Sequence, residues 1–94
     1  MDETNRYQRG LEIFERLYGE AGAQTLRSLE SAAPDLARYI VEFAFGDIFS
    51  RPGLDLKSRE LATVAALTAM GNSPAQLRAH IHGSLNAGCT QQEI

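Results

Sequence analysis

The chain has 94 residues, enough for one small domain, with a formal net charge of −3 and 44% hydrophobic residues. This acidic balance, with no Lys/Arg cluster longer than two residues, argues against nucleic acid and anionic membranes as partners, since both are bound through basic surfaces. Cys89 is the single cysteine, which excludes an internal disulfide. The longest uncharged run, residues 61–77, is broken by Gly71 and Pro74 and cannot span a bilayer, so we expect a soluble, cytoplasmic protein.

Helical spacing recurs along the first half of the chain, without strand-like alternation. A first helix is predicted up to Gly19, from an apolar stripe at steps of four, three and four: Tyr7, Leu11, Phe14 and Tyr18. A short, weaker helix is expected over residues 24–31. A third begins at Pro34, with an apolar side formed by Leu36, Ile40, Phe43 and Ile48, and "SRPGLD" at residues 50–55 interrupts the chain.

The helix predicted over residues 56–70 is unusual because it has no charged face after Glu60. Asp55 is placed to cap its start, and Gly71 to end it. The stretch "LATVAALTAM" is uncharged all round, a pattern typical of a helix that is buried on all sides.

A further helix is predicted from Pro74, with Ser73 as its N-cap, to Ala87. Because only residues 71–73 separate it from the preceding helix, the two should pack antiparallel as a helix hairpin. The whole chain is therefore predicted to be an all-α domain over residues 1–94, a small bundle of about five helices.

The last residues, "TQQEI", contain the spacing of a capping box, with Thr90 followed three positions later by Glu93. This pattern marks the start of a helix, yet the sequence ends one residue later. We therefore expect the sequence to lack a last C-terminal helix. The alternative is a frayed tail in which the spacing arises by chance.

Two histidines lie close together in "GNSPAQLRAHIHG", on the helix predicted after Ser73. On a helical wheel the core side is formed by Leu77, Ile81, Ser84, Leu85 and Gly88. His80 lies about 60° from Leu77, on the flank of that side, and His82 about 140° away, on the outer face. The two rings cannot share a metal within one chain. His80 is either a working imidazole or a packed histidine bonded to a backbone carbonyl.

Glu60 and Arg51 are the other candidates. Glu60 is the last charge before ten residues that read as buried, where desolvation would raise its pKa toward a useful acid–base range. The simpler interpretation is a first-turn glutamate stabilised by the helix dipole. Arg51, before Pro52 and Gly53, is placed either to bind a carboxylate or to bond loop carbonyls.

Several segments in order resemble the carboxymuconolactone decarboxylase family. The likeness is strongest in "RPGLDLKSREL", in the small-residue helix ending "TAMG", and in "LRAHIHGSLNAGCTQQEI", and "RYQRGLEIF" is similar to the family's opening. The resemblance implies an alkyl hydroperoxidase D-like helical fold. It also implies that His80 and Glu60 match the family's histidine and glutamate, and that a further helix follows the capping box.

Two chemical branches exist in this family, and the sequence distinguishes them. The peroxidase branch carries a CxxC whose second cysteine precedes the histidine by four residues. Here Ser73 and Gln76 occupy those positions, so dithiol chemistry has no thiols to use, and Cys89 lies beyond the helix end. The resemblance therefore implies the decarboxylase branch, in which 4-carboxymuconolactone loses CO2 to give 3-oxoadipate enol-lactone in protocatechuate breakdown.

This chemistry is expected to need no cofactor and no metal, because the lactone itself accepts the electrons left by CO2. We expect His80 to donate the proton, Glu60 to be its partner and Arg51 to anchor a substrate carboxylate. The expected partners are a small lactone carboxylate and further copies of the chain, as a hexamer or trimer. The alternatives are a family member with another substrate, a non-catalytic helical oligomer and, least supported, a thiol antioxidant.

Overall fold

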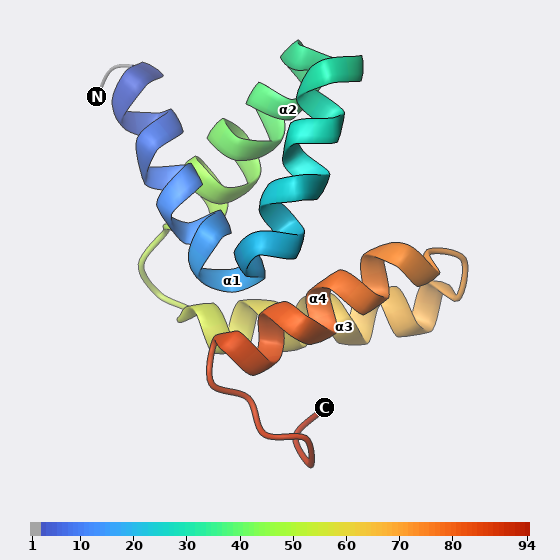
Figure 1. Ribbon diagram of the computed structural model, residues 1–94. Helices are drawn as coiled ribbons and strands as arrows, with labels where there is room; N and C mark the ends of the chain where they lie inside the picture. Colours follow the sequence, from blue (N-terminus) through green and yellow to red (C-terminus); the bar gives the residue numbers. More distant parts are fainter. Residues whose placement is uncertain (1–2) are drawn as a thin grey trace. The chain divides into compact units, whose positions relative to one another are not determined.

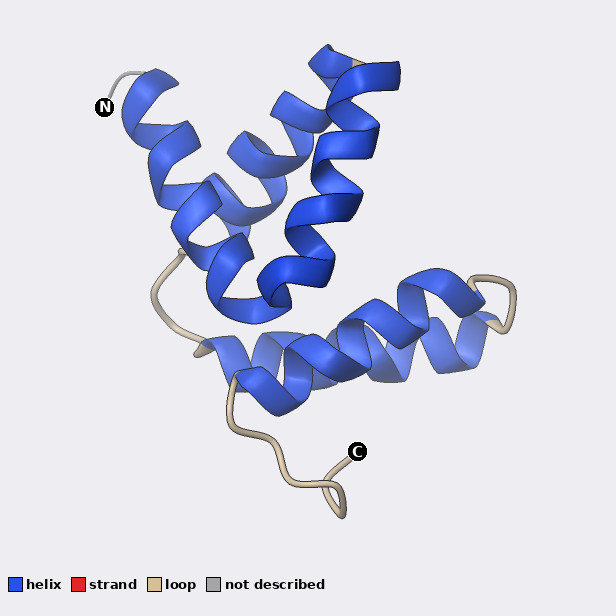
Figure 2. Ribbon diagram, viewed as in Figure 1, coloured by secondary structure: helices blue, strands red, loops and turns tan. Residues whose placement is uncertain are grey.

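The computed structural model describes residues 3–94, and side-chain surroundings from residue 5 on. These residues form four α-helices and one π-helical segment, joined by short loops and without a strand (Figure 2). The predicted all-α class is confirmed, and the expected count of about five helices is close. The chain divides into two compact units, one ending at Pro52 and the other beginning at Gly53.

In the first unit, α1 (Glu3–Ala32) is a long helix broken by a kink at Gly19. Gly19 has φ 60° and ψ −149°, a backbone conformation that is essentially restricted to glycine. Figure 1 shows the result as two arms that meet at a sharp bend. The predicted break at Gly19 is confirmed, but the second arm begins directly after it instead of at residue 24.

α2 (Pro34–Tyr39) runs on into η1 (Ile40–Phe49), a segment with the wider turns of a π-helix. The core of this unit is made by Leu26, Ala37 and Val41, with Tyr7, Leu11, Phe14 and Leu29 packed against it. The apolar side predicted from spacing is not the buried one, since Leu36 and Phe43 are 51% and 60% exposed. The buried side of η1 instead includes Val41 and Phe45, and the Phe45 ring packs against Phe14 and Tyr18 of α1.

The second unit is the predicted helix hairpin. α3 (Leu56–Met70) begins at Asp55, whose carboxylate accepts a hydrogen bond from the Ser58 amide at 2.8 Å, and ends at Gly71, with φ 72°. α4 (Pro74–Asn86) follows after three residues and returns beside α3 in the opposite direction (Figure 1). The residues at the helix ends thus placed both helices correctly from sequence, although the Ser73 side chain makes no capping hydrogen bond.

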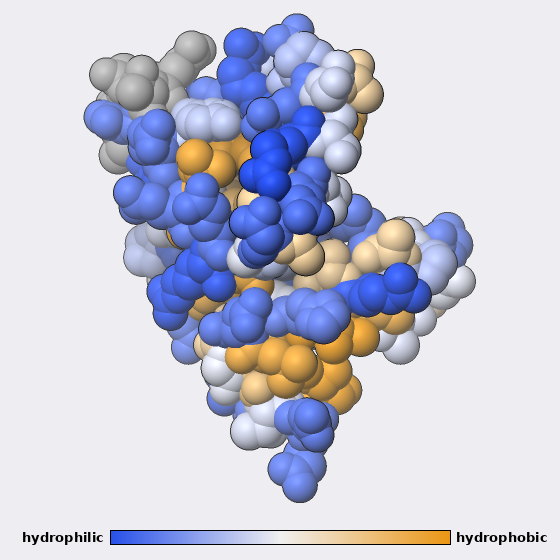
Figure 3. All heavy atoms as spheres, in the orientation of Figure 1, coloured by the Kyte–Doolittle hydropathy of each residue, from blue (hydrophilic) through white to orange (hydrophobic). Residues whose placement is uncertain are grey.

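The expectation that α3 is buried on all sides is wrong for the single chain. Within α3 only Glu60 and Val64 are buried, and Met70 is 61% exposed. The cause is that α4 covers one side of α3 and leaves its other uncharged positions at the surface. Figure 3 shows apolar residues gathered on this hairpin. Among the described helices, none is long and apolar enough to cross a membrane.

The C-terminal residues fold back onto the start of α3. The predicted capping box is formed: the Thr90 amide donates to the Glu93 carboxylate at 2.8 Å, and the Glu93 amide to the Thr90 hydroxyl at 3.1 Å. Glu93 also pairs with Lys57 at 3.0 Å. Cys89 is buried, and its thiol donates to the Lys57 carbonyl at 3.7 Å. It is a packed cysteine beyond the end of α4.

Candidate functional site

The hairpin brings together Glu60 and His80, the two residues that sequence analysis expected to act as partners. Glu60 lies in the second turn of α3 and His80 in the second turn of α4. His80 Nδ1 is 3.2 Å from Oε1 and 3.1 Å from Oε2 of Glu60. One ring nitrogen therefore faces both oxygens of a single carboxylate. An ionised carboxylate can only accept hydrogen bonds, so with Glu60 in that form Nδ1 is the donor of this contact.

Burial makes this contact energetically important. The Glu60 side chain is completely buried, whereas the His80 side chain keeps 15% of its surface exposed. A buried carboxylate is costly unless a partner compensates it, and His80 is such a partner. The contact also fixes the orientation of the imidazole and its tautomer. The hairpin thus holds the His80 ring in one orientation, with the Glu60 carboxylate buried behind it and part of the ring surface exposed.

Ser84 lies one turn after His80 and was not recognised as a polar neighbour from sequence. Its side chain is fully buried, and its hydroxyl donates to the His80 carbonyl at 2.8 Å. The buried positions of α4 are Gly83 and Ser84, while Leu85, which the wheel placed on the core side, is 38% exposed. Small residues at the contact let α4 approach α3 closely. The i to i+4 spacing of His80 and Ser84 was the available signal.

The remaining candidates lie apart from this pair. His82 is exposed, on the outer face of α4 as the wheel indicated. Arg51 belongs to the first unit, where it is exposed and its backbone amide donates to the Ile48 carbonyl at 3.2 Å. Ser73 and Gln76, at the positions of the peroxidase cysteines, lie at the start of α4. Across the described residues, no group of three or more His, Cys, Asp or Glu is placed to hold a metal ion.

The sequence is similar to one protein family and to several individual proteins. The model of the Carboxymuconolactone decarboxylase family matches residues 34–94. A 4-carboxymuconolactone decarboxylase from Acinetobacter baylyi is 36% identical over the whole chain, which spans 70% of that protein. Peroxisomal protein 2 from Schizosaccharomyces pombe is 34% identical over 93% of the chain, which spans 41% of it. Nitrosuccinic acid decarboxylase npaB from Metarhizium robertsii is 30% identical over 99% of the chain, which spans 66% of it.

Proposed function

Because the chain belongs to the carboxymuconolactone decarboxylase family, we propose that it is a cofactor-independent carboxy-lyase that acts on 4-carboxymuconolactone. The observation that carries the proposal is the contact between the buried Glu60 and the partly exposed His80. The decarboxylase from Acinetobacter baylyi, similar over the whole chain, supports this substrate.

The proposed reaction places one proton transfer on His80. The bond between the ring carbon and the departing carboxylate breaks, CO2 leaves, and the electron pair delocalises into the lactone carbonyl as a dienolate. The imidazolium form of His80 then gives the proton on Nε2 to a carbon of the dienolate. The Nδ1–H group of the ring stays hydrogen-bonded to the Glu60 carboxylate during this step. The neutral ring regains a proton from solvent, so the cycle consumes one proton for each CO2 released.

Glu60 has a positioning role in this proposal. Its carboxylate lies within hydrogen-bond distance of Nδ1 through both oxygens, so the ring cannot rotate without breaking the contact. Holding a catalytic group in one orientation removes part of the entropic cost of the proton transfer. Glu60 is completely buried, which keeps this carboxylate away from competing contacts with water.

Arg51 is proposed to bind a carboxylate of the substrate. Its guanidinium matches the geometry of a carboxylate and stays charged at all working pH values. The segment "SRPGLD" that carries it joins the two units. Arg51→Ala should raise KM more than it lowers kcat if the residue mainly binds the substrate.

The central test compares the two histidines of α4. His80→Gln removes the titrating ring and should lower kcat for CO2 release from 4-carboxymuconolactone by about 10²–10⁴, the usual contribution of a positioned proton donor. His82→Gln is the matched control, since His82 is exposed two residues away, and should change kcat less than about twofold. Helicity and oligomer size are compared by circular dichroism and light scattering.

Other outcomes separate the alternatives. If His80→Gln keeps full activity, the proposed donor is wrong and His80 is a packed histidine. If the intact chain does not release CO2 from this lactone, the substrate is wrong, and nitrosuccinic acid is the next compound to test, because a relative is named for its decarboxylation. Loss of activity on treatment with a chelator would contradict the proposed cofactor independence.

We also propose that the chain works as a homo-oligomer, a trimer or hexamer. The uncharged face of α3 supports this, since it is exposed in the single chain and apolar residues gather on the hairpin (Figure 3). Light scattering of the full chain at micromolar concentration should give a mass several times that of one chain. A monomer under these conditions would contradict the proposal.

A further inference from the structure

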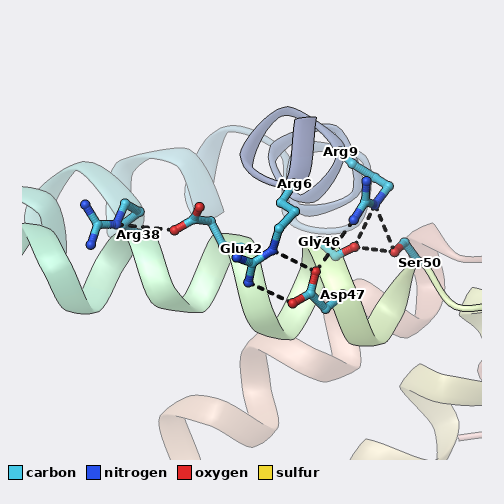
Figure 4. A network of polar contacts seen from close by, with 7 residues as sticks. All are labelled: Arg6, Arg9, Arg38, Glu42, Gly46, Asp47 and Ser50. Atoms are coloured by element: carbon cyan, nitrogen blue, oxygen red, sulfur yellow. Dashed lines mark hydrogen bonds and ion pairs between the residues drawn. The ribbon is translucent and has the colours of Figure 1, made fainter. Parts of the chain in front are cut away.

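Within the first unit, two arginines of α1 bind the end of η1. Arg6 pairs with both carboxylate oxygens of Asp47, at 3.1 and 2.8 Å. Arg9 donates from Nε to the Gly46 carbonyl at 2.7 Å and to the Ser50 hydroxyl at 3.2 Å. Figure 4 shows both side chains reaching from α1 to η1. These contacts are separated by 37 to 41 residues in sequence.

The contact of Arg9 with the Gly46 carbonyl lies in the last turn of η1. The last carbonyls of a helix have no partner within the helix, and a positive charge there also suits the helix dipole. The Gly46 carbonyl accepts from Arg9 and also from the Ser50 hydroxyl. Arg9 and Ser50 bind each other too, so three groups from two helices close a small network at the end of η1.

The backbones also approach closely at this point, which leaves little room for movement. A Cβ added to Gly46 would lie 2.5 Å from the Arg6 carbonyl oxygen, and one added to Gly10 would overlap the Val41 carbonyl oxygen. In both cases the added Cβ would be closer to the carbonyl oxygen than a normal van der Waals contact allows. The two helices are therefore fixed to each other by glycine contacts on one side of the network and by arginine contacts at its centre.

Arg51 follows directly after this network. Its amide donates to the Ile48 carbonyl at 3.2 Å, which ties its backbone to η1 directly before Pro52 and Gly53. The position of the Arg51 backbone thus follows that of residues 46–50, and in this segment Arg9 binds the Gly46 carbonyl and the Ser50 hydroxyl. A shift at the end of η1 would move the Arg51 backbone with it.

We infer that Arg9 is a positioning residue for Arg51: its guanidinium holds the end of η1, and so fixes the backbone from which Arg51 reaches a substrate carboxylate. The inference rests on the proposed role of Arg51 in substrate binding. Arg9 itself touches no substrate in this scheme. Its loss should weaken substrate binding and leave the proton transfer by His80 unaffected.

The test is a double-mutant cycle on the full chain with 4-carboxymuconolactone as the substrate. Arg9→Gln should raise KM roughly 3- to 10-fold, the effect of losing about one net hydrogen bond, with kcat within about twofold. In the Arg51→Ala background the same change should raise KM less than about twofold. This non-additivity separates positioning through Arg51 from a general loss of structure.

Two further variants and one further measurement complete the experiment. Ser50→Ala removes the smaller partner of the network and should also raise KM. It tests the inference even if Arg9→Gln folds poorly. Arg16→Gln is the matched control, an exposed arginine of α1, and should leave KM unchanged. Backbone amide hydrogen exchange of residues 47–51 should be about 3- to 10-fold faster in Arg9→Gln than in the unmodified chain.

The outcomes distinguish this inference from the proposed function. If Arg51→Ala leaves KM unchanged, the anchoring role of Arg51 fails and the inference fails with it. If Arg51→Ala raises KM but Arg9→Gln and Ser50→Ala do not, or if their effects add to that of Arg51→Ala, only the inference is overturned. If the lactone is not turned over at all, the proposed function fails and the inference falls with it, whereas unchanged exchange of residues 47–51 in Arg9→Gln overturns the inference alone.

Discussion

The burial of Glu60 predicts that one mutation of the pair should rescue another. His80→Ala removes the donor that both oxygens of the Glu60 carboxylate contact, and leaves a completely buried negative charge without this partner. Breaking a buried ion pair in this way typically costs about 3–5 kcal/mol of unfolding free energy. The lower end applies here, because the His80 side chain is 15% exposed and water can enter the space that it leaves.

Glu60→Gln changes this outcome. The amide keeps the size of the side chain and an acceptor for Nδ1–H, so the single change should cost only about 1 kcal/mol. In the double variant the buried carboxylate itself is absent. The double variant should therefore be more stable than His80→Ala by about 1–3 kcal/mol, although it carries one more substitution.

Urea unfolding followed by far-UV circular dichroism at neutral pH measures these differences, at one protein concentration because assembly also contributes to stability. For a chain of this size, 2 kcal/mol corresponds to a shift in Tm of about 8–16 °C. His82→Ala is the control and should change stability by no more than about 0.5 kcal/mol. If the double variant is as unstable as His80→Ala, or less stable, the buried charge is not what makes the pair important.

Three further predictions concern the first unit. Gly10→Ala should destabilise the chain by about 1–3 kcal/mol in urea unfolding, because the new Cβ would overlap the Val41 carbonyl oxygen; an unchanged midpoint would show that α1 and η1 can separate freely. Gly19→Ala should cost about 1–3 kcal/mol for a different reason, since nothing surrounds the added Cβ and only the backbone conformation is strained; stabilisation would mean that the kink is absent. The pKa of Asp47 lies below its usual value of 3.8 because Arg6 donates a hydrogen bond to its carboxylate and two arginines are close. The contribution of Asp47 to stability is therefore present above pH 3.8 and is lost as the pH falls through the lower folded-state pKa. Asp47→Asn should make the unfolding free energy depend less on pH below about pH 4, and identical acid unfolding curves would contradict this.

Local signals predicted the second unit well. Asp55 and Gly71 bound α3, and Pro74 opens α4, because caps and turn residues act within a few positions of one another. The short turn between the helices was enough to expect Glu60 and His80 on neighbouring helices. Whether their distance allows a hydrogen bond, and that Ser84 lies buried beside them, depends on how closely α4 packs, which sequence spacing does not determine.

Long-range contacts were beyond the reach of sequence reasoning. Nothing near Arg9 in the sequence points to Gly46 or Ser50, which lie about forty positions away, and a surface arginine of an amphipathic helix was the simplest interpretation. The burial of α3 was overestimated. An uncharged sequence shows that its residues tolerate burial, but it does not show whether other helices of the same chain cover them. Leu36 and Phe43 show the same difference in the first unit.

The position of Glu60 and His80 in one hairpin has a consequence for how the protein folds. The two residues are separated by 20 positions along the chain, so closing the loop between them costs little conformational entropy. Contacts of such short separation form early and quickly during folding. Their contact is made entirely within one of the two units, so substitutions that alter Arg51 and the helices before it do not remove either partner. Substitutions can therefore accumulate in the first unit without removing the contact between the histidine and its carboxylate.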